Sequence, residues 1–545
     1  MRIVTTVFLI LFCFIVSQAT AADRLWTYVG KDVIMSYRIS PLGNIVVTTP
    51  DKVFALDPET GRAQWKREDL KVGDIGLAFM PMMPFGITKI KNEISAINLE
   101  NGETIWDTHS LSFKTIYGYL PVPELNALLV FGEIGKKDKT VVLIDIISGE
   151  ARWRQDDLFN KKPDFECYSE LDDDYYSGGL FKQNRTMKRH QPVIVCDSGI
   201  VFYVSKDGLM KVNGETGELI WKVKELEGKK TPLVGKDHAH FVVDDNVIYV
   251  PYERKLIAVN LDDGSVVWNH KKKFKAHINQ MQMSIEGLVI YGFKPAQHYT
   301  SPDGEEVNPA CNYFMDVLMP NKGMSSWEKP LTDLDSPMPI FIDEDYAFVI
   351  RSEDIILVDL QTGSYNQFSH LKLKGKETPT HVERIGKNYL ISSPQNMLML
   401  KSRGGLRYHT YYKPPGATFV QKFLLVVGGT ILDEIFDTEN HMRYVYFDKD
   451  SLSRFGYSGG SFFMGAIDAC KMKFKQTVEG KKYHYIYTGE PLGDQKGYSL
   501  VKIDKETGDE EGRIWIDKQF PDYIIDFATE TVYARESNNK IFAIR

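Results

Sequence analysis

Short apolar runs separated by polar turns recur along most of the chain. One stretch shows this clearly: the runs 239–243, 247–251, 255–259 and 265–268 are rich in β-branched and aromatic residues, and polar turn residues divide them. Runs of this length between turn signals predict strands rather than helices. The pattern therefore predicts an all-β chain built from units of four short antiparallel strands.

Each well-preserved unit ends in the same arrangement of three residues. An Asp or Asn follows the third strand, a Gly stands four residues later, and a Trp four residues after that, at Asp57/Gly61/Trp65, Asn98/Gly102/Trp106, Asp145/Gly149/Trp153, Asn213/Gly217/Trp221 and Asn260/Gly264/Trp268. The acidic or amide side chain can bind turn amides and Gly can take a positive φ, so we expect the pair to close a turn. The Trp on the outgoing strand is large enough to fill the gap between neighbouring sheets. Regular recurrence of this kind indicates a repeat fold.

The repeat resembles that of the pyrroloquinoline-quinone (PQQ)-type β-propellers, the quinoprotein dehydrogenase-like fold. The resemblance implies four-stranded antiparallel blades around a central channel, with the turn and its Trp docking one blade on the next. It covers essentially the whole chain after residue 21. Within this family, the repeat scaffold is most similar to the non-enzymatic type used in bacterial outer-membrane protein assembly. The chain is longer than that type and lacks its lipid-anchor motif.

Degenerate copies continue the repeat beyond Trp268. They are Gly323/Trp327 without the Asp, Asp359/Gly363 with Gln367 in place of Trp, a copy with Gly405, and Asp504/Gly508 with Trp515 displaced. Repeat points fall at positions 57, 98, 145, 213, 260, 319, 359, 401, 448, 504 and 545, which makes eleven. Propellers typically have about 4–8 blades, so we expect one ring that is eight-bladed-like or larger, with two linked rings as the alternative.

The two ends of the repeat region suggest how the ring closes. Trp26 lacks an Asp or Asn and a Gly at the repeat spacing before it, whereas the run 540–545 resembles a third strand without a fourth. We therefore expect the strand at Trp26 to complete the C-terminal blade, which would also cover a sheet edge.

The first residues have the features of a secretory signal. Arg2 precedes the apolar run 7–16, and small residues follow at Ala19 and Ala21. We therefore predict a signal peptide over residues 1–21, a PQQ-like propeller over 22–545, and an exported, periplasmic or secreted protein. No later run is apolar and long enough to predict a transmembrane segment.

The net charge of the chain and the spacing of its repeats indicate which class of macromolecule it binds. Removal of Arg2 with the signal changes the formal net charge from −7 to −8, and this acidic balance gives no reason to expect nucleic-acid binding. The repeat spacing is stretched by insertions at about 156–190 and 299–313. Loops on a rigid ring often carry function, so we expect a protein partner to bind there.

Four cysteines follow the predicted signal: Cys167, Cys196, Cys311 and Cys470. In an exported protein they could form one or two disulfides, whose connectivity the sequence leaves open. Their spacing resembles no metal knuckle and no haem-attachment motif.

The resemblance to the quinoprotein family raises the question of a quinone-binding site. In the family's enzymes the quinone lies on a Trp, faces a disulfide between adjacent cysteines and contacts calcium. No two cysteines are adjacent in this sequence, and the repeat accounts for the Trp residues. We therefore predict no cofactor, with PQQ and calcium as the alternative.

Three other motifs could indicate catalysis, calcium binding or glycosylation, but each matches its pattern only in part or under a condition. Residues Gly456–Gly460 match a hydrolase Gly-x-Ser-x-Gly pattern around Ser458, but no helical period follows it. The acidic run Asp172–Asp174 lacks the spacing of a calcium loop. Asn184 fits a glycosylation acceptor if the host glycosylates exported proteins.

The histidines offer a further alternative. His238 and His240 would share one face of a first strand, and His277 and His381 lie near other first strands, which line the channel in this family. Convergence of these side chains would make a metal-binding propeller. The sequence thus predicts a non-catalytic binding or scaffold protein with no catalytic, cofactor or metal residues. A quinone- and calcium-dependent alcohol or sugar dehydrogenase is the first alternative, and the metal site the second.

Overall fold

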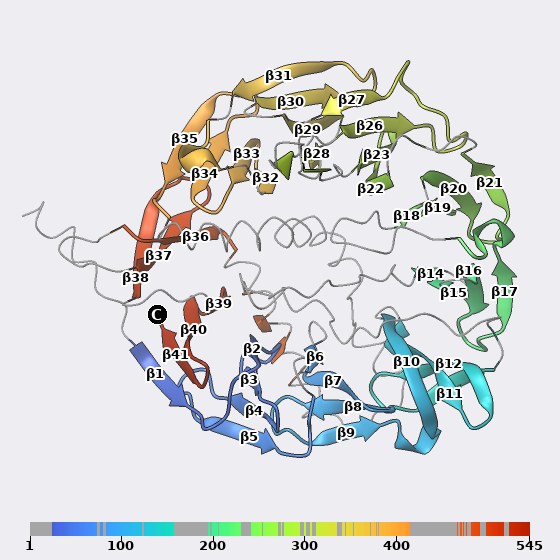
Figure 1. The fold of residues 1–545 in the computed structure, drawn as a ribbon, viewed down its shortest axis with the longest axis vertical. Coiled ribbons are helices and arrows are strands. Elements are labelled where there is room, and N and C mark those ends of the chain that lie inside the picture. The colour runs from blue at the N-terminus through green and yellow to red at the C-terminus, as the bar shows by residue number, and fades with distance from the viewer. Residues whose placement is uncertain are drawn as a thin grey trace, which may run out of the picture.

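The computed structural model shows a ring of β-sheets (Figure 1). It describes residues 24–72, 77–79, 83–122, 125–156, 158, 194–196, 199–204, 207–229, 241–252, 254–270, 274, 277–294, 299–300, 306–307, 312–334, 341–343, 345–351, 354–370, 372–377, 379, 381–414, six positions between 466 and 476, 481–490, 498–516 and 523–545. These residues form nine four-stranded sheets, one three-stranded sheet and one two-stranded sheet. The two-stranded sheet is an insertion, and the other ten are the blades.

Blades 1 to 5 follow one another along the first half of the chain. Their strands are, in blade 1, β2 (Ser36–Ile39), β3 (Ile45–Thr48), β4 (Val53–Leu56) and β5 (Ala63–Arg67); in blade 2, β6 (Ala78–Phe79), β7 (Phe85–Ile90), β8 (Glu93–Asn98) and β9 (Thr104–Asp107); in blade 3, β10 (Phe113–Val122), β11 (Ala127–Ile134), β12 (Lys137–Asp145) and β13 (Ala151–Gln155); in blade 4, β14 (Ile194–Cys196), β15 (Gly199–Val204), β16 (Gly208–Asn213) and β17 (Leu219–Lys222); and in blade 5, β18 (Val242–Asp244), β19 (Val247–Tyr252), β20 (Lys255–Asn260) and β21 (Val266–Asn269).

Blades 6 to 10 complete the ring. They consist, in blade 6, of β22 (His277–Ser284), β23 (Gly287–Lys294), β26 (Asn312–Leu318) and β27 (Leu331–Leu334); in blade 7, of β28 (Phe341–Asp343), β29 (Tyr346–Arg351), β30 (Asp354–Asp359) and β31 (Tyr365–His370); in blade 8, of β32 (His381–Ile385), β33 (Asn388–Ser392), β34 (Asn396–Leu400) and β35 (Leu406–Tyr411); in blade 9, of β36 (Tyr483–Thr488), β37 (Tyr498–Asp504) and β38 (Glu510–Ile516); and in blade 10, of β39 (Tyr523–Asp526), β40 (Thr531–Ser537), β41 (Lys540–Ile544) and β1 (Arg24–Val29).

The predicted ring closure is confirmed. β1 pairs antiparallel with β41, so the first described strand becomes the fourth strand of the last blade. In each four-stranded blade the first strand lies toward the ring centre and the fourth at the outer rim (Figure 1). Nine of the eleven repeat points lie within one residue of the end of a blade's third strand, position 504 ends β37, the middle strand of blade 9, and position 448 lies outside the described residues.

A single ring is what the packing shows, so the alternative of two linked rings is wrong. The described core divides into ten hydrophobic clusters, and each cluster joins two neighbouring blades. One cluster packs Trp26 and Ile524 of blade 10 against Ile45 and Phe54 of blade 1. Burial of apolar surface therefore continues from blade to blade without a break and stabilises the closed ring.

Helices play a small part. The short 3-10 helices η1 (His109–Leu111), η4 (Lys224–Leu226) and η5 (Lys374–Lys376) each follow the fourth strand of a blade. In the part of the chain that the structure describes, no helix is long and apolar enough to cross a membrane. The predicted signal peptide, residues 1–21, lies outside the described residues.

Candidate functional site

The three residues of the repeat close the turn and dock neighbouring blades, as their spacing predicts. In blade 1, Oδ1 of Asp57 accepts hydrogen bonds from the backbone N–H of Glu59 and Thr60, at 3.1 and 2.8 Å. Gly61 has φ +67°, and a Cβ there would lie 2.5 Å from the ring of Trp26. Only Gly fits this position, because the turn needs a positive φ and the Trp of the preceding blade lies directly on it.

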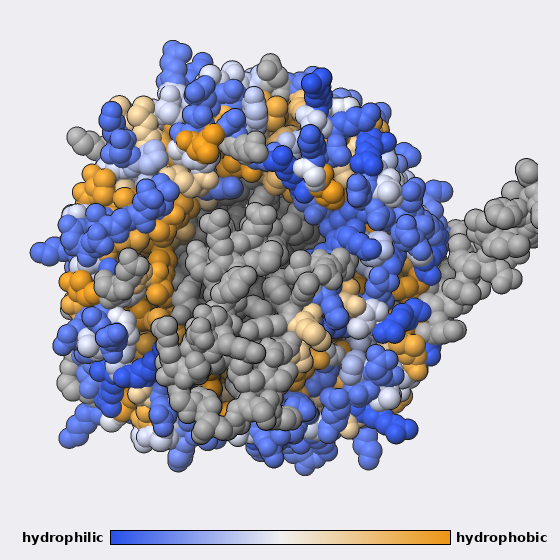
Figure 2. All heavy atoms as spheres, turned by 180° about the vertical axis from the view of Figure 1, so that it is seen from behind, coloured by the Kyte–Doolittle hydropathy of each residue, from blue (hydrophilic) through white to orange (hydrophobic). Residues whose placement is uncertain are grey.

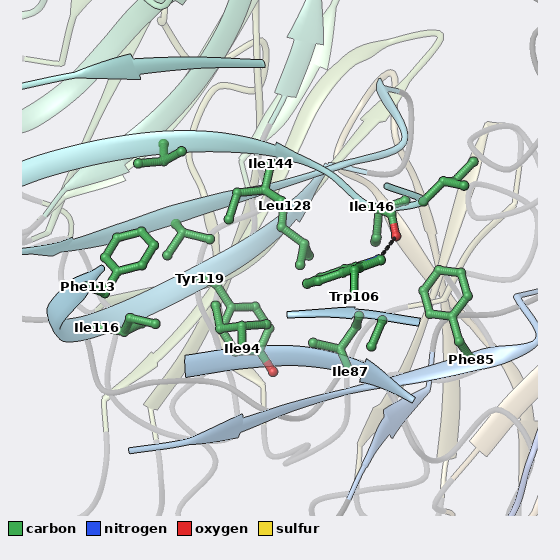
Figure 3. Packing of buried hydrophobic residues seen from close by; sticks show 14 of the residues in the cluster. Phe85, Ile87, Ile94, Trp106, Phe113, Ile116, Tyr119, Leu128, Ile144 and Ile146 are labelled. Atoms are coloured by element: carbon green, nitrogen blue, oxygen red, sulfur yellow. Dashed lines mark hydrogen bonds between the residues drawn. The ribbon is translucent and has the colours of Figure 1, made fainter. Parts of the chain in front are cut away.

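Each docking Trp also donates a hydrogen bond across the blade interface. The acceptor is always the carbonyl that follows the turn's first residue, as Figure 3 shows for Trp106 and Ile146. The indole N–H donates over 2.6–3.1 Å in seven pairs: Trp26 to Pro58, Trp65 to Leu99, Trp106 to Ile146, Trp153 to Gly214, Trp221 to Leu261, Trp268 to Pro320 and Trp327 to Leu360. These seven Trp residues are therefore structural docking residues.

Blade 8 uses a docking residue that the sequence reasoning missed. Tyr408 donates its hydroxyl to the carbonyl of Lys505, and its ring covers Gly508 on blade 9. The turn residue with positive φ is Gly404, at +88°, rather than the predicted Gly405. Counting four residues from Gly404 would have placed an aromatic residue at the docking position.

Blades 7 and 9 also lack a docking Trp, and each packs against the next blade in a different way. At the docking position of blade 7, Gln367 binds Asp354 of its own sheet, and the next residue, Phe368, packs into the interface with blade 8. At the docking position of blade 9 stands Gly512, and a tyrosine-rich cluster that includes Tyr487 and Tyr523 fills the interface with blade 10. Aromatic packing at these interfaces is thus kept without the Trp.

Blade 3 extends further than its neighbours on one face of the ring. Its strands β10, β11 and β12 have 10, 8 and 9 residues, whereas β2, β3 and β4 of blade 1 have 4 each. The extra pairs, as far as Ile134 with Lys137, lie at the end away from the docking turns. We call the ring face formed by the second-to-third-strand turns and the blade-to-blade connections the distal face.

The long hairpin of blade 3 carries a polar tip. Two register shifts in β10 bend that strand, and Gly132 allows close approach, since a Cβ there would lie 2.4 Å from the carbonyl oxygen of Thr115. Glu133 accepts a hydrogen bond from the hydroxyl of Tyr117 and lies 3.5 Å from the ammonium of Lys114. The carboxylate is thereby held in place beside exposed backbone at Gly135.

A second charged group lies where β13 ends on the same face. Asp156 accepts a hydrogen bond from the hydroxyl of Thr140 at 2.7 Å and binds the guanidinium of Arg154 at 3.0 Å. β13 ends and β14 begins on the distal face, so the predicted insertion at about 156–190 joins two strand ends there. Apart from Asp156 and residue 158, that insertion lies outside the described residues.

Blade 6 is elongated toward the same face. β22, β23 and β26 have 8, 8 and 7 residues, and the small hairpin of β24 (Tyr299–Thr300) and β25 (Glu306–Val307) is inserted between β23 and β26. The predicted insertion at 299–313 thus departs from the distal face as well.

The fold places the predicted site residues in separate positions or leaves them outside the described residues. His277 and His381 begin β22 and β32, the first strands of blades 6 and 8, as predicted. The candidates outside the described residues are His238, His240, Cys167, Cys311, Asp172–Asp174, Asn184 and Gly456–Gly460 with Ser458. Within the described ranges, no group of three or more His, Cys, Asp or Glu side chains could hold a metal ion.

The two described cysteines carry free thiols. Cys196 ends β14, and Cys470 is buried, which raises the pKa of its thiol to about 12. A thiol with such a pKa stays protonated and unreactive at neutral pH. Cys470 therefore has a packing role.

A buried polar cluster occupies the distal end of blade 8. Glu377 accepts hydrogen bonds from Ser393 at 2.7 Å and from the side-chain amide of Asn396 at 2.9 Å. The amide oxygen of Asn396 lies 2.9 Å from Nε2 of His409, and burial together with nearby Lys374 lowers the pKa of that imidazole. These bonds fix the turn between β33 and β34, so the cluster supports the distal face.

Comparisons with known proteins identify one matching family and several solved structures. A family profile described as that of the outer membrane protein assembly factor BamB matches residues 91–369. BamB from Moraxella catarrhalis is 10% identical, with 72% of this chain and 100% of that chain covered and a TM-score of 0.33. The quinohemoprotein alcohol dehydrogenase ADHIIG from Pseudomonas putida HK5 is 13% identical, with 72% and 73% covered and a TM-score of 0.33. At such TM-scores these structures carry no argument about this chain. No curated protein matches the sequence.

Proposed function

This chain belongs to the PQQ-like propeller family whose profile is described as that of the assembly factor BamB, and on that premise we propose that it is a non-catalytic scaffold that binds a protein partner. The partner surface is the distal face around blades 3 and 6. We also propose that the protein is exported, since residues 1–21 have the pattern of a secretory signal.

One observation carries the proposal. The elongated strands of blades 3 and 6, together with both predicted insertions, depart from the same face of the ring. The extra strand pairs of blade 3 are not needed to close the ring, because four-residue strands are enough in blade 1. Loops and hairpins that project from a rigid scaffold are the usual place for binding residues.

The use of the Trp residues supports a scaffold over a quinone enzyme. Seven of the eight Trp side chains lie between blades, where each indole N–H is bound to a carbonyl of the next blade. A Trp that is buried in this way has no free ring face on which a quinone could stack. The description of the matched family profile, that of an assembly factor, also favours the scaffold.

Site-specific photo-crosslinking tests the proposal. A photoreactive amino acid at exposed Lys136, on the tip of the blade 3 hairpin, should give a discrete crosslinked protein in the cells that make this chain. The same amino acid at Glu150, exposed in the docking turn of the same blade, is the matched control and should give none. Equal products at both positions, or none at either, would contradict the assignment of the distal face.

Two further measurements test the other parts of the proposal. The mature protein should begin near Ala22, as read by intact mass, and an uncleaved N-terminus in exported material would refute signal cleavage.

Purified protein given PQQ and calcium should show no dye reduction with alcohols or sugars, and turnover would favour the dehydrogenase.

A further inference from the structure

We propose that rings of this protein associate with one another edge to edge, through an acidic rim on blades 4 and 5 and a basic rim on blade 8. The acidic rim consists of Glu215, Glu218, Leu219, Ile220, Asp262, Asp263 and Val267, and the basic rim of Lys401, Arg403, Leu406 and Arg407. This inference concerns the outer edge of the ring and is independent of the distal face and its partner.

The acidic rim combines negative charge with exposed apolar side chains. Four carboxylates occupy the docking turns of blades 4 and 5, and the segments 213–221 and 260–268 contain no Lys or Arg. Beside them Leu219, Ile220 and Val267 are 46%, 43% and 43% exposed on the fourth strands. An edge strand with apolar residues next to unbalanced charge is a surface suited to a basic, partly apolar partner.

The basic rim is the complement at the equivalent position of another blade. The segment 401–408 contains Lys401, Arg403 and Arg407 and no acidic residue, and Leu406 beside them is 53% exposed. Leu406 stands two residues before docking Tyr408, as Leu219 stands two before docking Trp221. The two rims thus present the same kind of edge with opposite charge.

Neither rim neutralises its charge within the ring. Among the described residues, none of the seven charged side chains of the two rims forms an ion pair, whereas the docking turn of blade 3 pairs Asp145 with Arg152. β17 and β35 are also the last strands of their sheets, so the outer edge of each has no hydrogen-bonded neighbour strand there. Unbalanced charge, exposed aliphatic side chains and an open edge coincide at both rims.

A second copy of the chain is the occupant that this complementarity favours. Contact between two acidic rims or two basic rims would be repulsive, whereas acidic against basic rim is attractive. β17 and β21 lie on one side of the ring and β35 on the other (Figure 1). The contact is therefore head-to-tail, leaves one rim free at each end, and builds open chains of rings rather than a closed dimer.

Sedimentation velocity of the full-length protein tests this inference. At an ionic strength of about 0.01 M, where the screening length is about 30 Å, the weight-average mass should rise with protein concentration, and at about 1 M salt it should fall to that of the monomer. A monomer at every concentration in low salt would overturn the inference, even if a basic peptide from another source bound the acidic rim.

Charge-reversed variants identify the surfaces. One variant carries Glu215→Lys, Glu218→Lys, Asp262→Lys and Asp263→Lys, and the other carries Lys401→Glu, Arg403→Glu and Arg407→Glu. Each variant alone should be monomeric, and their mixture should associate again, because one then presents two basic rims and the other two acidic rims. Failure of the mixture to associate would overturn the pairing, while association of either variant alone would place the contact elsewhere.

A matched control separates specific contact from net charge. Glu100→Lys with Glu103→Lys reverses two carboxylates in the docking turn of blade 2, over which Arg67 lies, with its guanidinium 2.7 Å from the carbonyl of Gly102. This double variant should associate like the wild type, whereas Glu215→Lys with Glu218→Lys should weaken association. Equal weakening by both pairs would show that only net charge matters. Unchanged circular dichroism of all variants would confirm that they are folded.

Discussion

The buried ammonium of Lys211 is an exception among the residues that lie opposite a docking aromatic. The equivalent positions opposite Trp65, Trp106 and Trp268 are occupied by Ala55, Ala96 and Ala258. Lys211 is 2% exposed, and its Nζ donates to the carbonyl of Leu261 at 2.9 Å without a carboxylate partner among the described residues. Burial of a charge paired only with a neutral carbonyl is costly.

We predict that Lys211→Met stabilises the protein by about 1–2 kcal/mol, because it removes this desolvation cost. The Leu261 carbonyl keeps a donor, the indole N–H of Trp221 at 3.1 Å. Denaturant unfolding monitored by tryptophan fluorescence would measure the change. A lower unfolding midpoint for Lys211→Met would show that the ammonium is better accommodated than the structure indicates.

Lys222 provides the contrasting case on the same blade. Its ammonium lies 2.9 Å from Oδ1 of Asp207, whose side chain is 1% exposed. Lys222→Met should therefore destabilise the protein by about 3–5 kcal/mol, because it removes an ammonium that binds a buried carboxylate. Equal effects of the two Lys→Met changes would refute the distinction between them.

Asp316 should make stability depend on pH. It is 3% exposed on β26, and burial raises its pKa to about 6, against partial compensation by a hydrogen bond from Ser325. Because the folded state holds this proton more tightly than the unfolded state, the contribution of Asp316 to stability is fully present below about pH 4 and is lost as pH rises through about 6.

The predicted loss across that window is on the order of 2–3 kcal/mol, and Asp316→Asn should abolish it. The measurement is the difference in unfolding free energy between wild type and variant at several pH values from about 4 to 7. A difference that stays constant over this range would mean that Asp316 titrates alike in both states.

At the scale of elements, eight of the ten described blade interfaces contain a docking aromatic residue, seven of them Trp and one Tyr408. Tyr408→Phe keeps the ring over Gly508 but removes the donor to the Lys505 carbonyl, so we predict a loss of about 1–2 kcal/mol. Tyr408→Ala also removes the ring and should cost about 3–5 kcal/mol. Thermal unfolding would rank the variants, and equal stability of Tyr408→Phe and wild type would show that the hydroxyl contributes nothing.

The closing strand β1 can be tested in the same way. Trp26 is 7% exposed and docks on blade 1, whereas neighbouring Leu25 is 41% exposed. Trp26→Ala should cost about 3–5 kcal/mol and speed amide exchange in β41, while Leu25→Ala should stay within about 0.5 kcal/mol of wild type. Hydrogen-exchange mass spectrometry would measure this. Unchanged protection of β41 in Trp26→Ala would mean that closure does not depend on the docking Trp.

The sequence predicts local features well because they depend on neighbouring residues. The spacing of Asp57, Gly61 and Trp65 is enough to infer the turn. Closure joins distant segments but could be inferred because Trp26 and the run 540–545 each show an incomplete unit. Other features depend on residues far apart in the chain. Tyr408 contacts Lys505, so a shortened turn before it hides its role from a fixed spacing rule. The rims at Glu215 and Lys401 become complementary only when the ring places their blades on opposite sides.

At the scale of the whole molecule, the chain is one closed ring whose polar surface varies from side to side. The ring surface seen in Figure 2 is mostly hydrophilic and carries scattered hydrophobic patches. The apolar clusters are buried in the ten interfaces between blades. The turns, the hairpin tips and the fourth strands remain exposed on the surface. The repeat therefore forms a rigid platform, and its irregular blades carry the features that we assign to binding.

Electron cryo-microscopy of the full-length protein tests the central claim most directly. Class averages viewed down the ring axis should show one closed ring with ten spokes, because the described residues form ten blades and ten inter-blade clusters. An eight-spoked ring, an open arc or two smaller rings would contradict the account.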